Sequence, residues 1–290
     1  MSGDIVELAN AKINLSLRVL GKRADGYHQL ESFVMFAAIA DRLTCHAADE
    51  LSLEITGPFG RDLEGEKDNL ILEAARVFAT TLGRGPSVAF TLEKNLPIAS
   101  GMGGGSADAA AALRGMIRLW GDPPGSIAEL ALKLGADVPV CMRKRPSLMT
   151  GIGEVVTLIP RLPELHAVLV NPGVAVSTAD VFKRLNAGPV SSEARATSLP
   201  GMETVERVSA WCRENGNDLE APAIEGTPEV ERVLAQLRQS AGCKLARMSG
   251  SGATCFALYD NPFDAAEGAA SLGAANPTWW VKATRLLASR

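Results

Sequence analysis

The chain has 290 residues, of which 47% are hydrophobic and 21% charged, and its formal net charge is −4. This length and balance are typical of a globular protein with a sizeable core, built as one large domain or two modest ones. The slight negative charge gives no reason to expect nucleic acid or an anionic membrane surface as a partner, so any bound phosphate must be held by a local site.

Targeting and redox features are sparse. The first seven residues lack a basic stretch followed by an apolar one, so no signal peptide is expected, and no apolar run approaches the length of a membrane span. The five cysteines are scattered and form no CxxC pair. We therefore expect neither a zinc site nor a disulfide framework, but the reduced thiols of a cytoplasmic protein.

The first element in the chain is a predicted strand over residues 11–20, because apolar residues alternate there with polar ones. The alternation places Lys12 and Asn14 on the same face, directed away from the core. Taken alone, such residues are more often solvated than functional.

A turn with an Asp-Gly signal follows and ends in Tyr27 and His28. Tyrosine offers a flat face with a polar tip, and histidine can donate and accept hydrogen bonds. The two side chains either contact a ligand or form a partly buried pair that anchors the turn. Strands are then expected at residues 32–46 and 51–55, and a helix at 68–78 with Asp68 or Asn69 as its N-cap.

The most distinctive stretch is residues 96–110 (LPIASGMGGGSADAA), which follows a predicted strand at 88–92. Four glycines lie within residues 101–105, and an Ala-rich helix is expected from about 106 to 120. Glycines leading into a helix N-terminus leave several N–H groups directed at one point, which makes a site for an anion such as phosphate. The alternative is a flexible loop before an ordinary helix.

A second amphipathic helix is predicted at 126–134 and should end at Gly135. Pro139 is expected to hold Val138 in an extended conformation, so that Asp137 lies on a stiff corner. By itself Asp137 could equally be a solvated turn carboxylate. Residues 149–156 then predict a hairpin.

The remaining third of the chain alternates strands with helices, as in a split βαβ sheet. Ser177 or Thr178 is expected to cap the first of these helices, and residues 187–201 are expected to be a mobile connection because they are rich in Pro, Ser, Gly and Ala. Strands are predicted at 165–170, 245–248, 255–259 and 279–283, and helices at 176–185, 203–214, 228–240 and 263–272.

Two common phosphate-binding motifs do not fit the glycine stretch. A Walker A loop ends in Gly-Lys-Ser/Thr, whereas this one ends in Gly105, Ser106 and Ala107 with no lysine. A dinucleotide-binding loop would follow its strand directly and precede a strand that ends in an acidic residue. Here several residues, Pro97 among them, separate the strand from the glycines, and a helix, a turn and another helix follow.

The stretch instead resembles the phosphate loop of the GHMP kinase superfamily. Residues 11–15 (AKINL) are similar to its N-terminal motif and residues 248–254 (MSGSGAT) to its C-terminal glycine motif. Within the superfamily, three further stretches resemble the branch that phosphorylates a cytidine-diphosphate-linked polyol in non-mevalonate isoprenoid biosynthesis. These stretches are RADGYH at 23–28, GADVP at 135–139 and NDLE at 217–220.

The resemblance runs from about residue 9 to about residue 259 and implies an α+β fold of two subdomains with the site in the cleft between them. The N-terminal half, residues 1–158, would be like ribosomal protein S5 and carry the phosphate-binding glycine loop. The C-terminal half, residues 159–290, would be ferredoxin-like.

The resemblance also implies the reaction, transfer of the γ-phosphate of ATP to a tertiary 2-hydroxyl. Asp137 matches the base that receives the hydroxyl proton, and Lys12 the cation that keeps Asp137 ionised and stabilises negative charge near the transferring group. Asn14 would hydrogen-bond the substrate beside Lys12.

For the nucleobase, the resemblance implies that Tyr27 and Phe182 stack on the cytosine, that His28 hydrogen-bonds its edge, and that Thr178 makes a polar contact nearby. Phe182 could instead be a core residue of a short helix. ATP would lie on the loop, with Asn69 near the purine, and Mg²⁺ would accompany it with Ser106 as a possible ligand but no cage of protein ligands. The ATP-binding set is Pro97, Ile98, Ala99, Ser100, Gly101, Met102, Gly103, Gly104, Gly105, Ser106, Ala107 and Asn69.

Three residues depart from the usual loop: Ser100 replaces a smaller residue, Met102 a common Leu, and Ala107 a second Ser. The last change removes a hydroxyl that could contact phosphate. Two alternative functions remain, a GHMP kinase of the homoserine or mevalonate type and a non-catalytic nucleotide-binding regulator. Retention of Lys12 and Asp137 argues against the regulator. The partner expected is a small molecule, for a chain that is a monomer or a homodimer.

Overall fold

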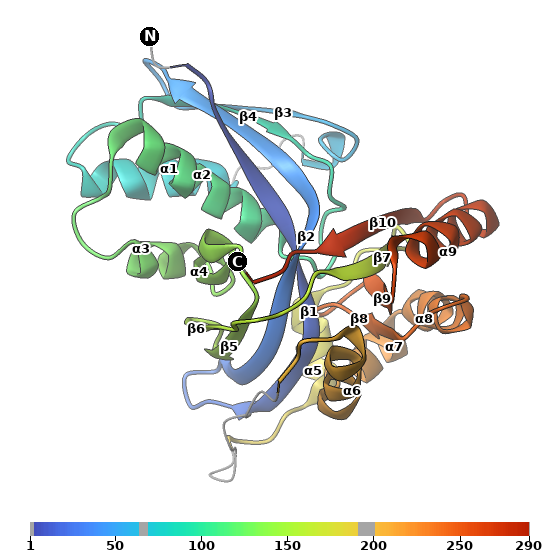
Figure 1. Ribbon diagram of the computed structural model, residues 1–290. Coiled ribbons are helices and arrows are strands. Elements are labelled where there is room, and N and C mark those ends of the chain that lie inside the picture. The colour runs from blue at the N-terminus through green and yellow to red at the C-terminus, as the bar shows by residue number, and fades with distance from the viewer. Residues whose placement is uncertain (1–2, 64–68, 191–200, 290) are drawn as a thin grey trace. The chain divides into compact units, whose positions relative to one another are not determined.

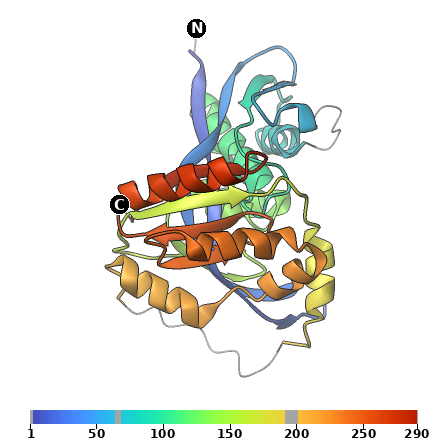
Figure 2. The same cartoon turned by 90° about the vertical axis from the view of Figure 1, so that its right-hand side faces the viewer.

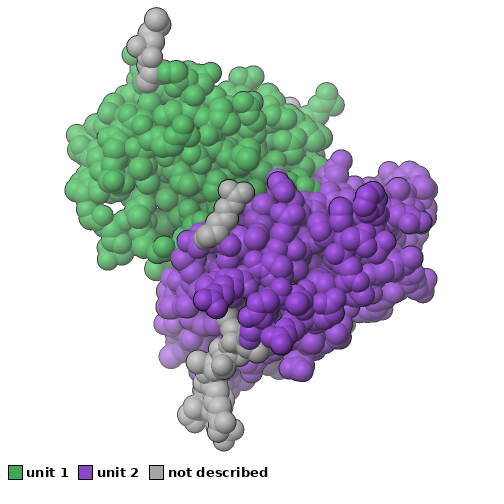
Figure 3. Space-filling view, viewed as in Figure 1, with its two compact units in different colours: residues 1–11, 39–98, 103–144 green, residues 12–38, 99–102, 145–290 purple. Residues whose placement is uncertain are grey.

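The computed structural model describes residues 3–63, 69–190 and 201–289 (Figure 1). These residues form two compact units, each described here by itself (Figure 3). Unit 1 comprises residues 1–11, 39–98 and 103–144, and unit 2 comprises residues 12–38, 99–102 and 145–290. Two long paired strands, β1 (Ile5–Lys22) and β2 (His28–Ala47), contribute residues to both units.

Unit 1 combines a sheet with helices. Residues 42–47 of β2 pair antiparallel with β4 (Val88–Glu93), which pairs in parallel with β3 (Ser52–Thr56). The register of the β2–β4 pair runs from Arg42 opposite Glu93 to Ala47 opposite Val88. The helical elements are the 3₁₀ turn Arg61–Leu63, α1 (Leu70–Thr81), α2 (Gly104–Trp120), α3 (Ile127–Leu134) and α4 (Val138–Arg143).

Local chemistry explains where these helices begin and how they pack. Asn69 caps α1 by accepting a hydrogen bond from the Ile71 N–H at 2.9 Å, and Ser126 caps α3 in the same way through the Glu129 N–H. α2 buries its run of alanines, Ala109 to Ala112, and packs against α1. At Gly115 a Cβ would lie 2.6 Å from the sulfur of Cys45 on β2, so only glycine lets the helix approach the strand this closely.

Unit 2 is built around the antiparallel strand order β10-β7-β9-β8, formed by β7 (Leu165–Asn171), β8 (Leu245–Met248), β9 (Cys255–Tyr259) and β10 (Trp280–Leu286). They are accompanied by the helices α5 (Thr178–Leu185), α6 (Val205–Asn215), α7 (Glu220–Gly226), α8 (Glu229–Gln239) and α9 (Pro262–Ala275). Figure 2 shows α8 and α9 side by side in front of the strands, where α9 packs on β10 and β7, and α8 on β8 and β9. This is the predicted split βαβ arrangement.

A hairpin completes unit 2. β5 (Ser147–Gly151) and β6 (Val155–Leu158) pair with each other. β5 also pairs antiparallel with residues 30–34 of β2, from Leu30 opposite Gly151 to Val34 opposite Ser147. The hairpin predicted over residues 149–156 is confirmed. The pairing places the β5–β6 turn, which contains Ile152, next to the start of β2.

Two local predictions were wrong. Val138 and Pro139 lie in the first turn of α4 and are not extended, because Pro at the first helical positions loses no hydrogen bond that the helix needs. β1 is not half-buried: Ala9 to Leu17 are all buried, so both faces of the strand are covered. The helix α7 was not predicted. The expected mobile connection falls mostly on residues 191–200, which lie outside the described residues.

Within the part of the chain that the structure describes, no helix is long and apolar enough to cross a membrane. All five cysteines are unpaired. The described residues also contain no group of three or more His, Cys, Asp or Glu side chains arranged to hold a metal ion.

Candidate active site

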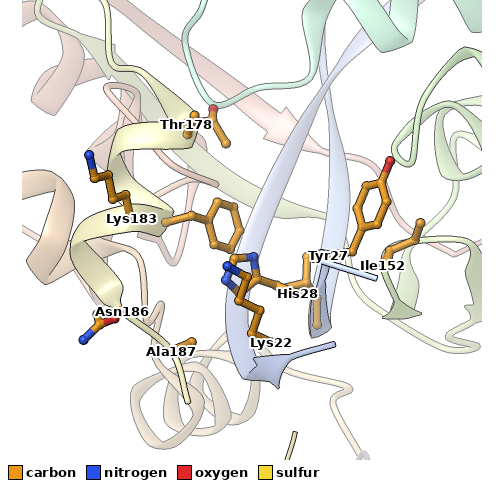
Figure 4. A pocket seen from close by; sticks show the side chains of 12 residues that line it. Lys22, Tyr27, His28, Ile152, Thr178, Lys183, Asn186 and Ala187 are labelled. Carbon is orange, nitrogen blue, oxygen red and sulfur yellow. The ribbon is translucent and has the colours of Figure 1, made fainter. Parts of the chain in front are cut away.

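A pocket of about 750 Å³ opens in unit 2 between the β1–β2 turn and α5 (Figure 4). Tyr27 and His28 line it from the turn, and Thr178 and Phe182 from α5. The structure thus brings together the four residues predicted for the nucleobase. Lys22 and Lys183 line it as well, and none of the described residues that line it is acidic, so this part of the pocket favours an anionic ligand.

Inside the pocket the imidazole of His28 stacks on the ring of Phe182, with centroids 4.5 Å apart and planes 22° apart. Rings this close leave no space for a base between them. Burial, together with the charge of Lys22, lowers the pKa of His28, so its imidazole is neutral at neutral pH and offers one donor and one acceptor. Tyr27 is 60% exposed, and Figure 4 shows its ring beside Ile152.

Asn14 is buried in β1, with 2% of its surface exposed. Its backbone N–H donates to Ser249 Oγ at 3.0 Å, and its side-chain amide donates to Ser32 Oγ at 2.8 Å. Its Oδ1 atom is buried and has no hydrogen-bond partner among the described residues. A buried acceptor without a partner is costly, so this oxygen is suited to accept a hydrogen bond from a ligand hydroxyl.

The first part of the glycine loop, residues 99–102, packs against the C-terminal glycine motif within unit 2. Gly101 has a φ of +74°, and a Cβ on it would lie 2.8 Å from the Gly252 nitrogen and closer still to the Ser249 oxygen. Ser249 Oγ donates to the Gly101 carbonyl at 3.1 Å, and the Lys12 N–H donates to the Met102 carbonyl at 2.9 Å. Only glycine fits at residue 101, and the close contacts fix the loop to β1.

Asn217 holds the C-terminal glycine motif in turn. Its side-chain amide donates to the carbonyls of Met248 at 2.9 Å and Gly250 at 2.8 Å, while its own oxygen accepts from the Leu219 N–H. The NDLE motif therefore acts on the site through the backbone of residues 248–250.

The second part of the loop begins α2 in unit 1. Gly103 is the N-cap, with a φ of +65° and no side chain to cap the helix. The Ala107 N–H makes the first helical bond, to the Gly103 carbonyl, so the N–H groups of residues 104–106 precede the helical ladder and point from its positive end. This is the geometry that binds phosphate.

The three residues that depart from the usual loop sequence are all buried. Ser100 is 4% exposed, Met102 is fully buried and Ala107 is 2% exposed. The methyl group of Ala107 therefore packs in the core of unit 1.

Asp137 lies at the N-cap of α4 in unit 1, and its backbone carbonyl accepts from the Cys141 N–H at 3.2 Å. A Cβ on Gly135 would lie 3.9 Å from Ser106 Oγ, so the segment that carries Asp137 runs beside the first turn of α2. Asn69 starts α1 close by, since a Cβ on Gly105 would lie 3.7 Å from the Leu70 side chain. Lys12 belongs to β1 in unit 2 and is 5% exposed.

Sequence reasoning missed a buried ionic cluster behind α2. The Lys94 ammonium lies 2.6 Å from Asp41 Oδ2 and 2.6 Å from Asp108 Oδ2, and a Cβ on Gly104 would lie 3.2 Å from the same nitrogen. The cluster thus ties β2 and the chain after β4 to the start of the phosphate-binding helix. The sequence feature that could have revealed the cluster is Asp108, because a carboxylate among alanines that become buried requires a partner.

Comparison with known proteins agrees with this arrangement. The family described as GHMP kinases N terminal domain matches residues 69–145, and the one described as GHMP kinases C terminal matches residues 198–278. A 4-diphosphocytidyl-2-C-methyl-D-erythritol kinase of Parvibaculum lavamentivorans is 50% identical over 284 residues, which cover 97% of this chain and 98% of that protein. The chain belongs to this kinase family.

Further relatives of the family agree. A 4-diphosphocytidyl-2-C-methyl-D-erythritol kinase of Cereibacter sphaeroides is also 50% identical, covering 96% of this chain and 98% of that one. A crystal structure of 4-(cytidine 5'-diphospho)-2C-methyl-D-erythritol kinase matches with a TM-score of 0.77 at 33% identity, over 97% of this chain and 99% of the other. Homoserine kinase from Cytophaga hutchinsonii, at 16% identity and a TM-score of 0.67, shares the fold.

The α+β GHMP kinase fold is therefore confirmed. The two family matches lie on either side of residue 158, whereas the compact units interleave along the chain because β1 and β2 contribute to both. The division at residue 158 stays a prediction, as do the roles of the individual site residues.

Proposed function

We propose that the protein transfers the γ-phosphate of ATP to the tertiary 2-hydroxyl of 4-diphosphocytidyl-2-C-methyl-D-erythritol, giving the 2-phosphate and ADP in the synthesis of isoprenoid precursors by the non-mevalonate route. The observation that carries the proposal is the aromatic and basic pocket of unit 2, in a chain half identical to kinases named for this substrate. A homoserine or mevalonate kinase has no nucleobase to bind in such a pocket.

The pocket suits the cytidine diphosphate part of the substrate. We assign Phe182 as a stacking face for cytosine and neutral His28 as a hydrogen-bonding partner of the base edge, with Tyr27 as the second stacking face and Thr178 as a polar contact. The His28 ring stacks on Phe182 with centroids 4.5 Å apart, so we infer that cytosine takes the place of the imidazole on that ring. Lys22 and Lys183 are placed to offset the charge of the diphosphate.

Asn14 is assigned to the polyol. Its buried Oδ1 lacks a partner among the described residues, and a substrate hydroxyl would supply the missing donor. Because the Asn14 side-chain amide donates to Ser32 Oγ, the orientation of this acceptor is fixed.

We assign the proton acceptor to Asp137 and the supporting cation to Lys12. Asp137 would take the proton from the 2-hydroxyl as the oxygen attacks the γ-phosphate, while Lys12 would stabilise the negative charge of the transferring group. The burial of Lys12 supports this role, because a buried ammonium requires compensating negative groups. The position of Asp137 beside the first turn of α2 supports its role too.

ATP is assigned to the glycine loop, residues 97–107, with the N–H groups of residues 104–106 on its phosphates and Asn69 near the purine. Mg²⁺ would supply charge neutralisation on the phosphates. The Ser106 hydroxyl, in the first turn of α2, is of a type that fits it, and Mg²⁺ bound to nucleotide needs few protein ligands. We further propose a cytoplasmic location, supported by the five unpaired cysteines, and a small molecule as the partner of a monomer or homodimer.

The test is a substrate panel. Purified protein is incubated with Mg²⁺ and ATP plus the cytidine-diphosphate substrate, homoserine or mevalonate, and ADP release is followed. We expect turnover with the cytidine compound alone. Turnover with homoserine or mevalonate, and none with the cytidine compound, would overturn the proposal.

A further inference from the structure

The short segment that follows α5 lines one end of the pocket in unit 2. Asn186 ends the helix in a left-handed conformation, with a φ of +47°, and lines the pocket together with Ala187. Figure 4 shows Lys22 and Ala187 at the same end of the pocket. We call residues 187–190 the strap.

The strap is paired with the end of β1. The Lys22 N–H donates to the Gly188 carbonyl at 2.7 Å, and the Val190 N–H donates to the Lys22 carbonyl at 3.2 Å. Lys22 and Pro189 thereby form a parallel β-bridge. Two backbone hydrogen bonds thus join the end of α5 to the residue from which the β1–β2 turn begins.

Gly21 makes this pairing possible. Its φ is +140°, and a Cβ on it would lie 2.5 Å from the Val190 Cα, 2.6 Å from the Val190 nitrogen and 2.7 Å from the Pro189 oxygen. All three atoms are backbone, so none can turn aside as the end of a side chain can. Any side chain at residue 21 must displace the strap.

The other end of α5 is held separately. The hydroxyl groups of Thr178 and Ser251 are 2.7 Å apart in a hydrogen bond, and Val181 is buried in the core of unit 2. Phe182 lies between these anchors and the strap. Its position in the pocket therefore depends on both ends of the helix being fixed.

We propose that Gly21 is a positioning residue for the nucleotide part of the substrate. By admitting the strap, it fixes the C-terminal end of α5 and with it the position of Phe182, the stacking face assigned to the base. The inference rests on the proposed function for the identity of the ligand. The strap itself is a property of unit 2 with or without that ligand.

The experiment compares Gly21→Ala with Gly273→Ala, a control in α9 of the same unit, where a Cβ meets no atom within 4 Å. Steady-state kinetics are measured with the cytidine substrate and with ATP varied in turn. For Gly21→Ala we expect KM for the cytidine substrate to rise at least tenfold, while kcat and KM for ATP stay within twofold of the wild type. The control should match the wild type in all three.

Binding of cytidine diphosphate, measured by calorimetry, separates this inference from the proposed function. Weaker binding to Gly21→Ala with faster hydrogen exchange at the Lys22 amide supports the strap even if the wild type turns over no cytidine substrate, an outcome that would refute the function alone. Unchanged KM and unchanged binding would overturn the inference.

A second variant, Val190→Pro, tests the same contact if Gly21→Ala does not fold. Val190→Pro removes the N–H that bonds to Lys22 without adding an atom at residue 21. We expect a smaller rise in the same KM, with ATP kinetics unaffected. A variant that binds cytidine diphosphate like the wild type would contradict the role of the strap.

Discussion

Replacing Lys94 with methionine should destabilise unit 1 strongly. The Lys94 side chain is 4% exposed, and its ammonium lies 2.6 Å from carboxylate oxygens of Asp41 and Asp108, which are 0% and 6% exposed. Methionine keeps the apolar stem but leaves two carboxyl groups buried without a cation. Removing one partner of a buried ion pair costs about 3–5 kcal/mol.

The two carboxyl groups differ in how they are supported. Asp41 Oδ1 accepts from the Asn95 N–H at 2.6 Å and the Leu96 N–H at 2.8 Å, whereas Asp108 Oδ1 is buried with no partner among the described residues. Burial raises the pKa of Asp108 to about 7, because the Lys94 charge offsets only part of the desolvation and Asp41 adds repulsion. Asp108 is therefore the carboxyl group of this cluster whose pKa is raised.

The sign of the pH dependence follows. The folded-state pKa of Asp108 is above its ordinary value of 3.8, so folding favours the protonated form. Its contribution to stability is complete below about pH 4 and is lost as the pH rises toward 7. Asp108→Asn removes the ionisation, so this part of the pH dependence of unfolding should disappear. Between pH 5 and pH 8, the variant should therefore lose less of its unfolding free energy than the wild type loses.

The assay is thermal and urea unfolding followed by circular dichroism without ATP. Each kcal/mol of lost stability lowers Tm by about 2–4 °C in proteins of this size, so we expect Lys94→Met to lower Tm by roughly 10 °C. The matched control is Lys244→Met, which breaks an ion pair with Asp260 whose partners are 38% and 39% exposed, so that its loss should change stability little. A Lys94→Met protein within 1 kcal/mol of that control would refute the reasoning.

Three further predictions concern the site. Asp137→Asn should fold and bind ATP in calorimetry but lose about 10²–10⁴-fold in kcat, the range of general-base catalysis; near-normal kcat would remove Asp137 as the base. Asn14→Ala should raise KM for the cytidine substrate about tenfold, since one hydrogen bond is lost, and equal KM values would exclude the contact. Because burial and the charge of Lys22 lower the pKa of His28, its neutral form should persist above pH 6.5. KM for the cytidine substrate should therefore be flat from pH 7 to 8.5 and rise only in acid, and nuclear magnetic resonance titration of His28 should follow the same curve.

Much of the fold was predictable because its signals are local. The caps Asn69 and Ser126 each bond within three residues, so the starts of α1 and α3 could be predicted from neighbouring residues. The strands β7 and β9 were predicted at residues 165–170 and 255–259, where the sequence has short apolar runs. Local rules failed at Val138, where the usual restriction before proline is overridden because Pro139 falls in the first turn of α4.

The site was harder to predict because its contacts are between distant residues. Lys94 meets Asp41 and Asp108, which are 53 and 14 residues away, and no spacing rule connects them. The alternating pattern suggested that Asn14 faces solvent. Instead its side chain is buried, and its backbone N–H donates to Ser249, which lies 235 residues later in the chain. The bridge between Lys22 and Pro189 was likewise not predictable, since glycine at residue 21 signals only a turn until its neighbours are known.

The most direct test of the account is ATP consumption by the purified protein in the presence and absence of 4-diphosphocytidyl-2-C-methyl-D-erythritol, with phosphorus nuclear magnetic resonance of the product. The account predicts that ADP forms only when this compound is present and that the new phosphate is an ester of its 2-hydroxyl. Substrate-independent ATP hydrolysis, or a phosphate on any other hydroxyl, would contradict it.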